Sequence, residues 1–184
     1  MERKILYFES PGPANTEATL RAVRDRVREL GIKTVVLASS HGGTARQALG
    51  MLRGDDVQII VVTICAGFAE EGWTMDDGTR RELEDAGCRV LTGIHALGDD
   101  VSGAFDQSAP NAVVAQTLYR FCQGMKVCVE IALMAADAGL LDTEREIAAV
   151  AGTGEGADTA IILKPAYPRK FRELKIREIL AMPR

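Results

Sequence analysis

The sequence predicts a three-layer α/β fold with a mostly parallel sheet and an antiparallel edge strand. Short apolar runs rich in β-branched residues alternate with amphipathic helical patterns through the first half of the chain. This alternation is typical of βαβ units with right-handed crossovers, whose helices cover both faces of a sheet. Near the C-terminus, the short segment 152–158 joins two further apolar runs. It is too short for a crossover helix, so the second run should be antiparallel to the first.

The elements are expected in a regular order. Residues 4–9 form a short strand, and a helix follows that Asn15 or Thr16 caps and Gly31 ends. Next come a buried strand at 34–38, a helix at 44–52, a second buried strand at 57–64, a polar helix at 76–86 and a short strand at 88–92. The last two strands are expected at 147–151 and 159–163, and the tail 170–184 is a basic, amphipathic closing segment.

Residues 110–139 are apolar nearly all round and predict one long, core-packed helix with a kink at Gly124. Arg120, Lys126 and Glu130 exclude a membrane span there. The apolar helix and the basic tail would suit a symmetric homo-oligomer.

Composition narrows the class of protein. A chain of 184 residues with 47% hydrophobic residues predicts one domain over residues 1–184 that needs neither a disulfide nor a metal. The net charge of −4 argues against nucleic acid or an anionic membrane as partner. The N-terminal apolar run is too short for a signal peptide, so we expect a cytoplasmic protein. The four cysteines include no C-x-x-C pair, which favours buried free thiols over a metal or redox site.

Open α/β sheets bind ligands beyond the carboxyl ends of their strands. The best candidate is the turn after the second strand, where a strand, a hydroxyl-rich glycine turn and a helix follow one another. Its residues are Ser39, Ser40, His41, Gly42, Gly43 and Thr44. The glycines let backbone N–H groups approach a phosphate, and the helix N-terminus adds positive potential. An ordinary turn whose Ser and Thr only cap the helix explains the same residues equally well.

The other strand ends add further candidates: Thr63 and Gly67, the region of His95, and Thr153 with Gly154. The glycine-rich segment 152–156 is not a dinucleotide motif, because a strand and not a helix follows it. His41 and His95 are more simply polar lining residues than an acid–base pair, since no carboxylate has a recognisable spacing to either. The loop 67–73 carries Phe68 and Trp73, which either stack on a flat ring as part of a flap or anchor the loop.

Two segments resemble a known family. VVLASSHGGTARQAL is similar to the strand, turn and helix of the pyruvate kinase C-terminal domain, and IAAVAGTGEGADTAIIL to its final strand, loop and strand. The whole chain more closely resembles stand-alone archaeal and bacterial relatives of that domain, as do its SPGPANTE and GFAEEGW segments.

The resemblance implies the fold and a ligand. In pyruvate kinase the matching turn holds a phosphate of an activator, and the catalytic residues belong to a separate barrel, which this sequence lacks. The resemblance therefore implies that a phosphate is contacted by Ser39, Ser40, Gly42, Gly43 and Thr44. Some stand-alone relatives hold FMN here, which suggests the phosphate on the turn and the flavin over the strand ends. His41 and the glycines stand where the kinase turn usually has an arginine, which weakens a bisphosphate site. The leading hypothesis is therefore a flavin-nucleotide-binding protein; a sensor of a phosphorylated metabolite is the alternative, and whether any reaction is catalysed stays open.

Overall fold

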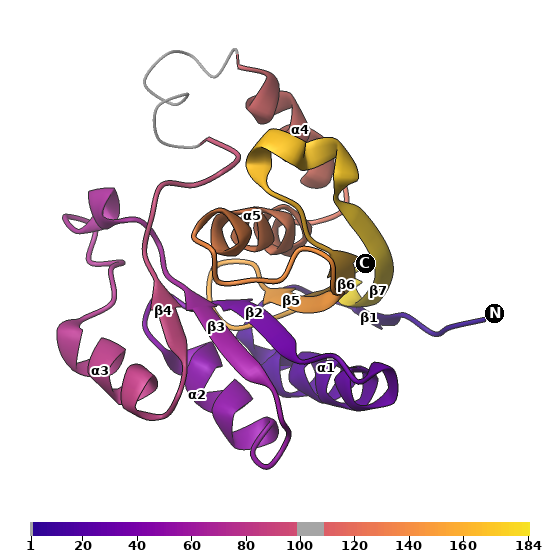
Figure 1. Ribbon diagram of the computed structural model, residues 1–184, viewed down its shortest axis with the longest axis horizontal. Helices are drawn as coiled ribbons and strands as arrows, with labels where there is room; N and C mark the ends of the chain where they lie inside the picture. The colour runs from indigo at the N-terminus through magenta and orange to yellow at the C-terminus, as the bar shows by residue number, and fades with distance from the viewer. Residues whose placement is uncertain (1, 99–108) are drawn as a thin grey trace.

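The computed structural model describes residues 2–98 and 109–184, which form a seven-stranded sheet in the order β1-β7-β6-β5-β2-β3-β4 (Figure 1). The strands are β1 Leu6–Phe8, β2 Thr34–Ala38, β3 Gln58–Val62, β4 Arg89–Leu91, β5 Ile147–Ala151, β6 Thr159–Lys164 and β7 Lys175–Pro183. The helices are α1 Thr16–Leu30, α2 Gly43–Met51, α3 Asp77–Asp85, α4 Pro110–Leu118 and α5 Gln123–Asp137. Three short 3-10 helices are η1 Pro13–Asn15, η2 Ala66–Phe68 and η4 Pro168–Glu173.

The sheet is mostly parallel, as the sequence predicts. β2 pairs parallel with β3 and β5, β3 with β4, and β1 with β7. β6 is antiparallel to both β5 and β7, which confirms the antiparallel strand. β7 and β1 continue the sheet beyond β6. Most of the segment 170–184, which the sequence predicts to be an amphipathic closing tail, is therefore the strand β7. Only the C-terminal end of β7 is buried, which explains why its hydropathy pattern is weak.

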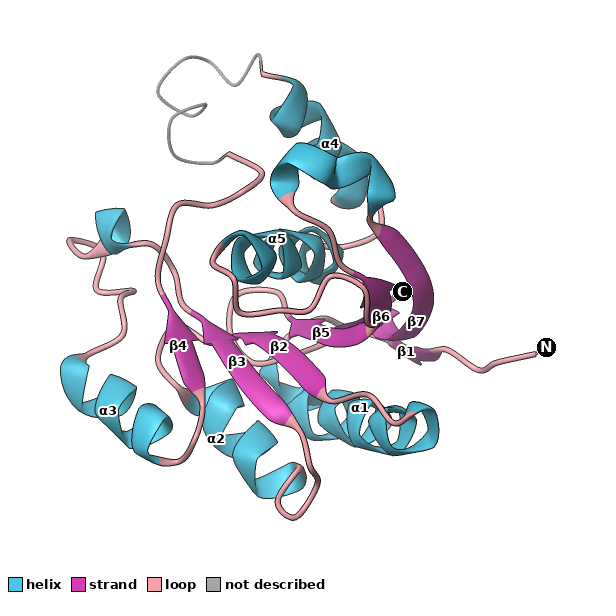
Figure 2. Ribbon diagram, in the orientation of Figure 1, coloured by secondary structure: helices cyan, strands magenta, loops and turns pink. Residues whose placement is uncertain are grey.

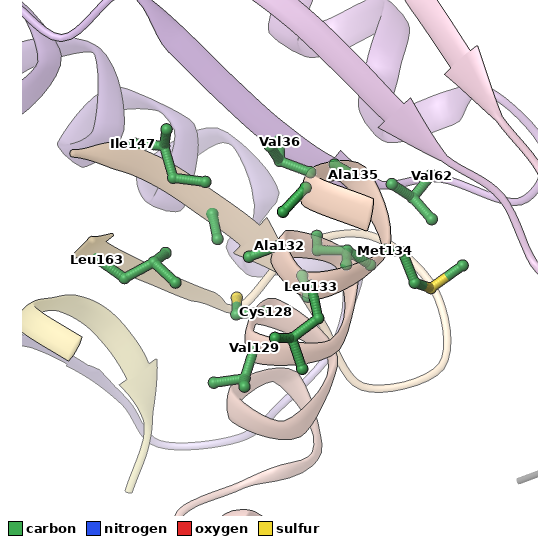
Figure 3. Close-up of a cluster of buried hydrophobic side chains, with 14 of the residues drawn as sticks. Val36, Val62, Cys128, Val129, Ala132, Leu133, Met134, Ala135, Ile147 and Leu163 are labelled. Carbon is green, nitrogen blue, oxygen red and sulfur yellow. The ribbon is translucent and has the colours of Figure 1, made fainter. Parts of the chain in front are cut away.

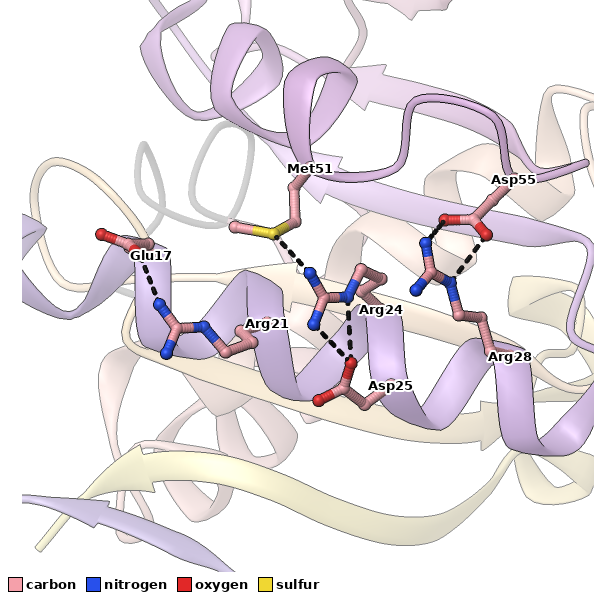
Figure 4. Close-up of polar contacts among 7 residues, drawn as sticks. All are labelled: Glu17, Arg21, Arg24, Asp25, Arg28, Met51 and Asp55. Carbon is pink, nitrogen blue, oxygen red and sulfur yellow. Dashed lines mark hydrogen bonds and ion pairs between the residues drawn. The ribbon is translucent and has the colours of Figure 1, made fainter.

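Helices cover both faces of the sheet, with α1, α2 and α3 on one side and α5 on the other (Figure 2). Alternate residues of β2 point to opposite faces of the sheet. Val35 and Leu37 pack with α1 and α2, whereas Val36 packs with α5. Between α5 and the sheet, buried side chains such as Leu133 and Ile147 form a continuous core (Figure 3). The outer face of α1 is solvated and carries ion pairs, including Arg28 Nε to Asp55 at 2.8 Å (Figure 4). These layers confirm the three-layer fold.

The predicted helix over 110–139 is wrong in one respect, because it is two helices. The chain breaks at 119–122, where Cys122 is extended and its Sγ accepts a bond from Met125 N at 3.4 Å. The break precedes Gly124 instead of falling on it. It lets the first turn of α5 lie directly against β6, which a straight apolar pattern does not predict.

The start of α1 also differs from the prediction. Neither Asn15 nor Thr16 caps the helix with its side chain. The Thr16 hydroxyl instead donates to Pro13 O at 2.7 Å and accepts from Ala157 N at 2.9 Å, which joins α1 to the loop after β5. At the other end, Gly31 has φ 66° and ends the helix as predicted.

Gly124 allows the close approach of α5 to β6. A Cβ at this position would lie 2.2 Å from Thr159 Oγ1, well inside contact distance. Glycine-to-alanine changes inside a helix normally stabilise it, so Gly124→Ala tests the packing directly. We expect it to lower the free energy of unfolding by about 1–3 kcal/mol in chemical denaturation, as overpacking does. The matched control is Gly50→Ala in α2, where a Cβ meets open space and should not destabilise. Equal stability of Gly124→Ala and wild type would contradict this packing.

Candidate functional site

A cavity of about 760 Å³ opens at the carboxyl ends of the central strands. It lies where β2 and β5 pair and where the connections from their carboxyl ends diverge, since β2 leads to β3 on one side of the pair and β5 leads to β6 on the other. Such a topological switch point is where open α/β sheets bind ligands. The volume is in the range of small-molecule and cofactor sites.

The turn after β2 forms one wall. Ser39 N donates to Val62 O at 3.0 Å, and Ser39 Oγ accepts from Ala45 N at 3.4 Å, so this hydroxyl satisfies a backbone donor in the first turn of α2. The capping role therefore applies to Ser39. The N–H groups of Gly43 and Thr44 also belong to the first turn, where a helix offers no acceptor of its own. Both residues line the cavity.

Gly42 and Arg46 fix the shape of this turn. Gly42 has φ 82°, and a Cβ there would lie 2.5 Å from Thr79 of α3, so only glycine fits. Arg46 binds Glu82 through two nitrogens, at 2.8 and 2.7 Å, and its Nη1 donates to His41 O at 3.3 Å. These bonds lower the pKa of Glu82. Arg46 thus braces the turn against α3, and it does not belong to the cavity lining.

The loop after β5 forms the second wall and is organised by Asp158. This carboxylate is fully buried. Its Oδ2 accepts from Gly12 N at 3.0 Å and from Thr153 N at 3.1 Å, and its Oδ1 accepts from Thr159 Oγ1 at 2.7 Å. Gly156, with φ 73°, lets this loop touch η1 and the start of α1, because a Cβ there would lie 2.4 Å from Pro13 Cα and 2.5 Å from Thr16 Oγ1. The tight loop between antiparallel strands is confirmed, and β6 follows it instead of a helix.

Three rings line a third wall. Phe68 stacks on Trp73 with centroids 5.5 Å apart and on His95 with centroids 6.1 Å apart. All three residues line the cavity, and Trp73 is half exposed. The loop is thus anchored by its own aromatic contacts while its rings face the cavity. His41 lines the same cavity, so the two histidines share one site.

The first turns of α5 supply a buried ion pair to the cavity wall. Lys126 Nζ lies 2.7 Å from Glu130 Oε2, and the two side chains are only 2% and 4% exposed. Glu130 Oε1 also accepts from Leu97 N at 3.1 Å. The ammonium lies over the Tyr119 ring at 5.8 Å. Among the described residues that line the cavity, Lys126 is the one lysine or arginine.

The ends of β3 and β4 are joined by hydroxyls at the cavity. Thr63 Oγ1, in the lining, lies 2.6 Å from Thr92 Oγ1. Arg80 of α3 donates to Thr92 Oγ1 at 2.5 Å. This chain of bonds ties the rim of the cavity to a surface helix.

The structure brings most of the predicted site residues together. Those that line the cavity are Ser39, Ser40, His41, Gly43, Thr44, Thr63, Phe68, His95 and Gly154. Gly42, Gly67 and Thr153 belong to the same loops but do not line it. Lys126 and Glu130 are not among the predicted site residues, because in the sequence their charges indicate only that the helix does not span a membrane. Two opposite charges four residues apart in an otherwise apolar helix are the signal that marks them.

The remaining chemistry-bearing residues lie elsewhere. The four cysteines form no disulfide, and Cys65, Cys88 and Cys128 are buried as predicted, whereas Cys122 is partly exposed. Burial raises the pKa of the Cys88 and Cys128 thiols, which keeps them protonated and unreactive. Within residues 2–98 and 109–184, no group of three or more His, Cys, Asp or Glu could hold a metal ion. No helix in those ranges has the length and apolar character to cross a membrane.

Fold and cavity together define a doubly wound α/β domain with a cleft at its switch point. Residues 17–163 match the family model described as pyruvate kinase, alpha/beta domain, and the chain belongs to this family. Similar solved structures include a pyruvate kinase from Cryptosporidium parvum, at 15% identity and TM-score 0.45 over 84% of this chain and 23% of that one. Another is the C. parvum pyruvate kinase in complex with ADP, at 17% identity and TM-score 0.42 over 91% and 24%. The chain thus spans about a quarter of the length of these kinases.

Removing the Asp158 carboxylate should destabilise the protein. Asp158→Ala leaves the buried N–H group of Gly12 and the partly buried N–H group of Thr153 without their acceptor, so we expect the free energy of unfolding to fall by about 3 kcal/mol or more. The exposed Asp137 at the end of α5 provides the control, because Asp137→Ala should change stability by about 0.5 kcal/mol or less. Similar denaturation midpoints for the two variants would refute the role given to Asp158.

Proposed function

We propose that the cavity binds a phosphorylated small molecule with a planar ring, and that FMN is the leading candidate. The observation that carries the proposal is the meeting, at one switch point, of the amino end of α2 with a wall of stacked rings. Membership in the pyruvate kinase alpha/beta domain family is compatible with a phosphate-bearing ligand.

The phosphate is assigned to the turn 39–44. The first N–H groups of a helix and its positive dipole end favour an anion, and Gly43 leaves the backbone open to close approach. Ser40 and Thr44 add hydroxyl donors in the lining. Arg46 is engaged by Glu82, so backbone and hydroxyl donors would hold one phosphate without a guanidinium.

The ring is assigned to the wall of Phe68, Trp73 and His95. A flat heterocycle stacks on aromatic side chains, and the cavity has room for a nucleotide-sized ligand. The residues present therefore fit FMN at both of its ends. A bound flavin would supply electron or hydride transfer.

A sensor of a sugar phosphate is the second candidate. It is favoured by the amide and hydroxyl side chains in the lining, Gln47, Gln123 and Thr63, which suit sugar hydroxyls. Thermal-shift measurements separate the two candidates, because a sensor is stabilised by sugar phosphates but not by FMN or riboflavin.

FMN binding has a built-in reporter. Trp73 is the single tryptophan and lines the cavity, so FMN added to the purified protein should quench its fluorescence with saturation. Riboflavin, which lacks the phosphate, should bind at least tenfold more weakly, as loss of charge-assisted hydrogen bonds predicts. A protein that is colourless when purified and shows no saturable quenching by FMN would refute the flavin assignment.

Gly43→Asp isolates the phosphate end. A carboxylate at the first position of α2 suits the helix dipole, so the fold should be retained, but it repels a phosphate on the turn. We expect the affinity for FMN to fall about tenfold or more, to the level of riboflavin, while riboflavin affinity stays unchanged. Gly50→Asp adds the same charge to the other end of α2 and should leave FMN affinity near wild type. Equal FMN binding by all three proteins would place the phosphate elsewhere.

A further inference from the structure

We propose that Lys126 is a second recognition point of the cavity, which binds an electron-rich oxygen at the end of the ligand away from the phosphate. The matching group is a ring carbonyl or a carboxylate. The inference rests on the proposed function, because it names the chemistry of the ligand at the other end of the same cavity.

Lys126 lies on α5, on the other side of the sheet from the helix that begins at the phosphate-binding turn proposed above. α2 and α5 lie on opposite faces of the sheet, and both contribute to the cavity. The turn 39–44 leads into α2, whereas Lys126 lies on α5. Its partner Glu130 is bonded to Leu97, close in the chain to His95 of the aromatic wall. A ligand with its phosphate on the turn and its ring against that wall extends toward Lys126.

The burial of Lys126 is unfavourable for stability, which supports a role in binding. Its ammonium and the Glu130 carboxylate are almost fully buried, and an ion pair in such a place rarely gains net stability over apolar residues. The ion pair joins two turns of α5, and the bond from Leu97 N to Glu130 needs an acceptor but no cation. The neighbouring residues Met125, Cys128 and Val129 are buried and apolar. A buried ammonium that lowers stability and lines a cavity is best explained by a role in binding a ligand there.

The chemistry of the ammonium defines the ligand. A lysine donates up to three hydrogen bonds and prefers oxygens with negative charge. Glu130 holds the ammonium in place and, through Leu97 N, fixes the adjacent loop. The flavin ring carries two carbonyls on its pyrimidine edge, and a phosphorylated sugar acid carries a carboxylate. Both offer the required oxygen.

The test compares Lys126→Met/Glu130→Gln with wild type. The double variant removes both charges, so no buried charge is left alone, and the glutamine oxygen can still accept from Leu97 N. We expect affinity for FMN and for riboflavin to fall by the same factor, about tenfold or more, because the ring end is weakened and the phosphate end is not. The control is Lys164→Met, which breaks an ion pair with Glu144 outside the cavity lining and should leave binding unchanged.

Each outcome supports or overturns the proposal. Unchanged affinity in the folded double variant overturns it, as does a loss confined to FMN, which would place Lys126 at the phosphate. If wild type binds sugar phosphates and not FMN, it should prefer 6-phosphogluconate to glucose 6-phosphate, which lacks the carboxylate, and the double variant should lose that preference. Wild type that binds none of these probes overturns the proposed function as well; phosphate-dependent FMN binding that the variants leave intact overturns only the role of Lys126.

Discussion

The buried carboxylate of Asp158 is the interaction on which the arrangement of the site depends. Its Oδ2 accepts hydrogen bonds from backbone N–H groups of the N-terminal loop and of the loop after β5. Its Oδ1 accepts one from the hydroxyl of Thr159, the first residue of β6. The N-terminal loop is distant in the sequence from the other two segments, and the loops hold few apolar side chains that could join them. A carboxylate with all of its neighbours donating is stable in the interior because hydrogen bonds replace its water. The start of α1 is thereby brought to the rim of the cavity.

The cavity follows from this constraint together with the strand order. Parallel strands place their carboxyl ends at one edge, and the divergence of the connections that follow β2 and β5 leaves a crevice between these two strands. Close contacts at Gly42, Gly124 and Gly156 then set how near the surrounding loops and helices come. The walls differ in character, with helix N–H groups on one side, stacked rings on another and a buried ion pair on α5. That combination suits a ligand with an anionic end and a planar end.

Local patterns in the sequence predict much of this fold. Buried β-branched runs gave β2 and β3 within two residues of their ends, and Gly31 marks the end of α1. Contacts between distant segments are not visible in such patterns. The break at Cys122 exists because α5 packs on Thr159, and β7 is half solvated, so neither follows from hydropathy alone. For the site, the rule of strand ends selects the turn at Ser39 and the loop at Gly154. It does not select Lys126, because the rule concerns segments that follow a strand, whereas α5 precedes β5.

The proposed function requires that a phosphate binds at the start of α2, in a cavity that also holds a planar ring. The most direct measurement is a crystal structure of the protein soaked with FMN. We expect density for the phosphate within hydrogen-bond distance of the backbone N–H groups of Gly43 and Thr44, with the ring beside Phe68. Density for FMN at another surface, or an empty cavity at a concentration that saturates Trp73 quenching, would contradict it.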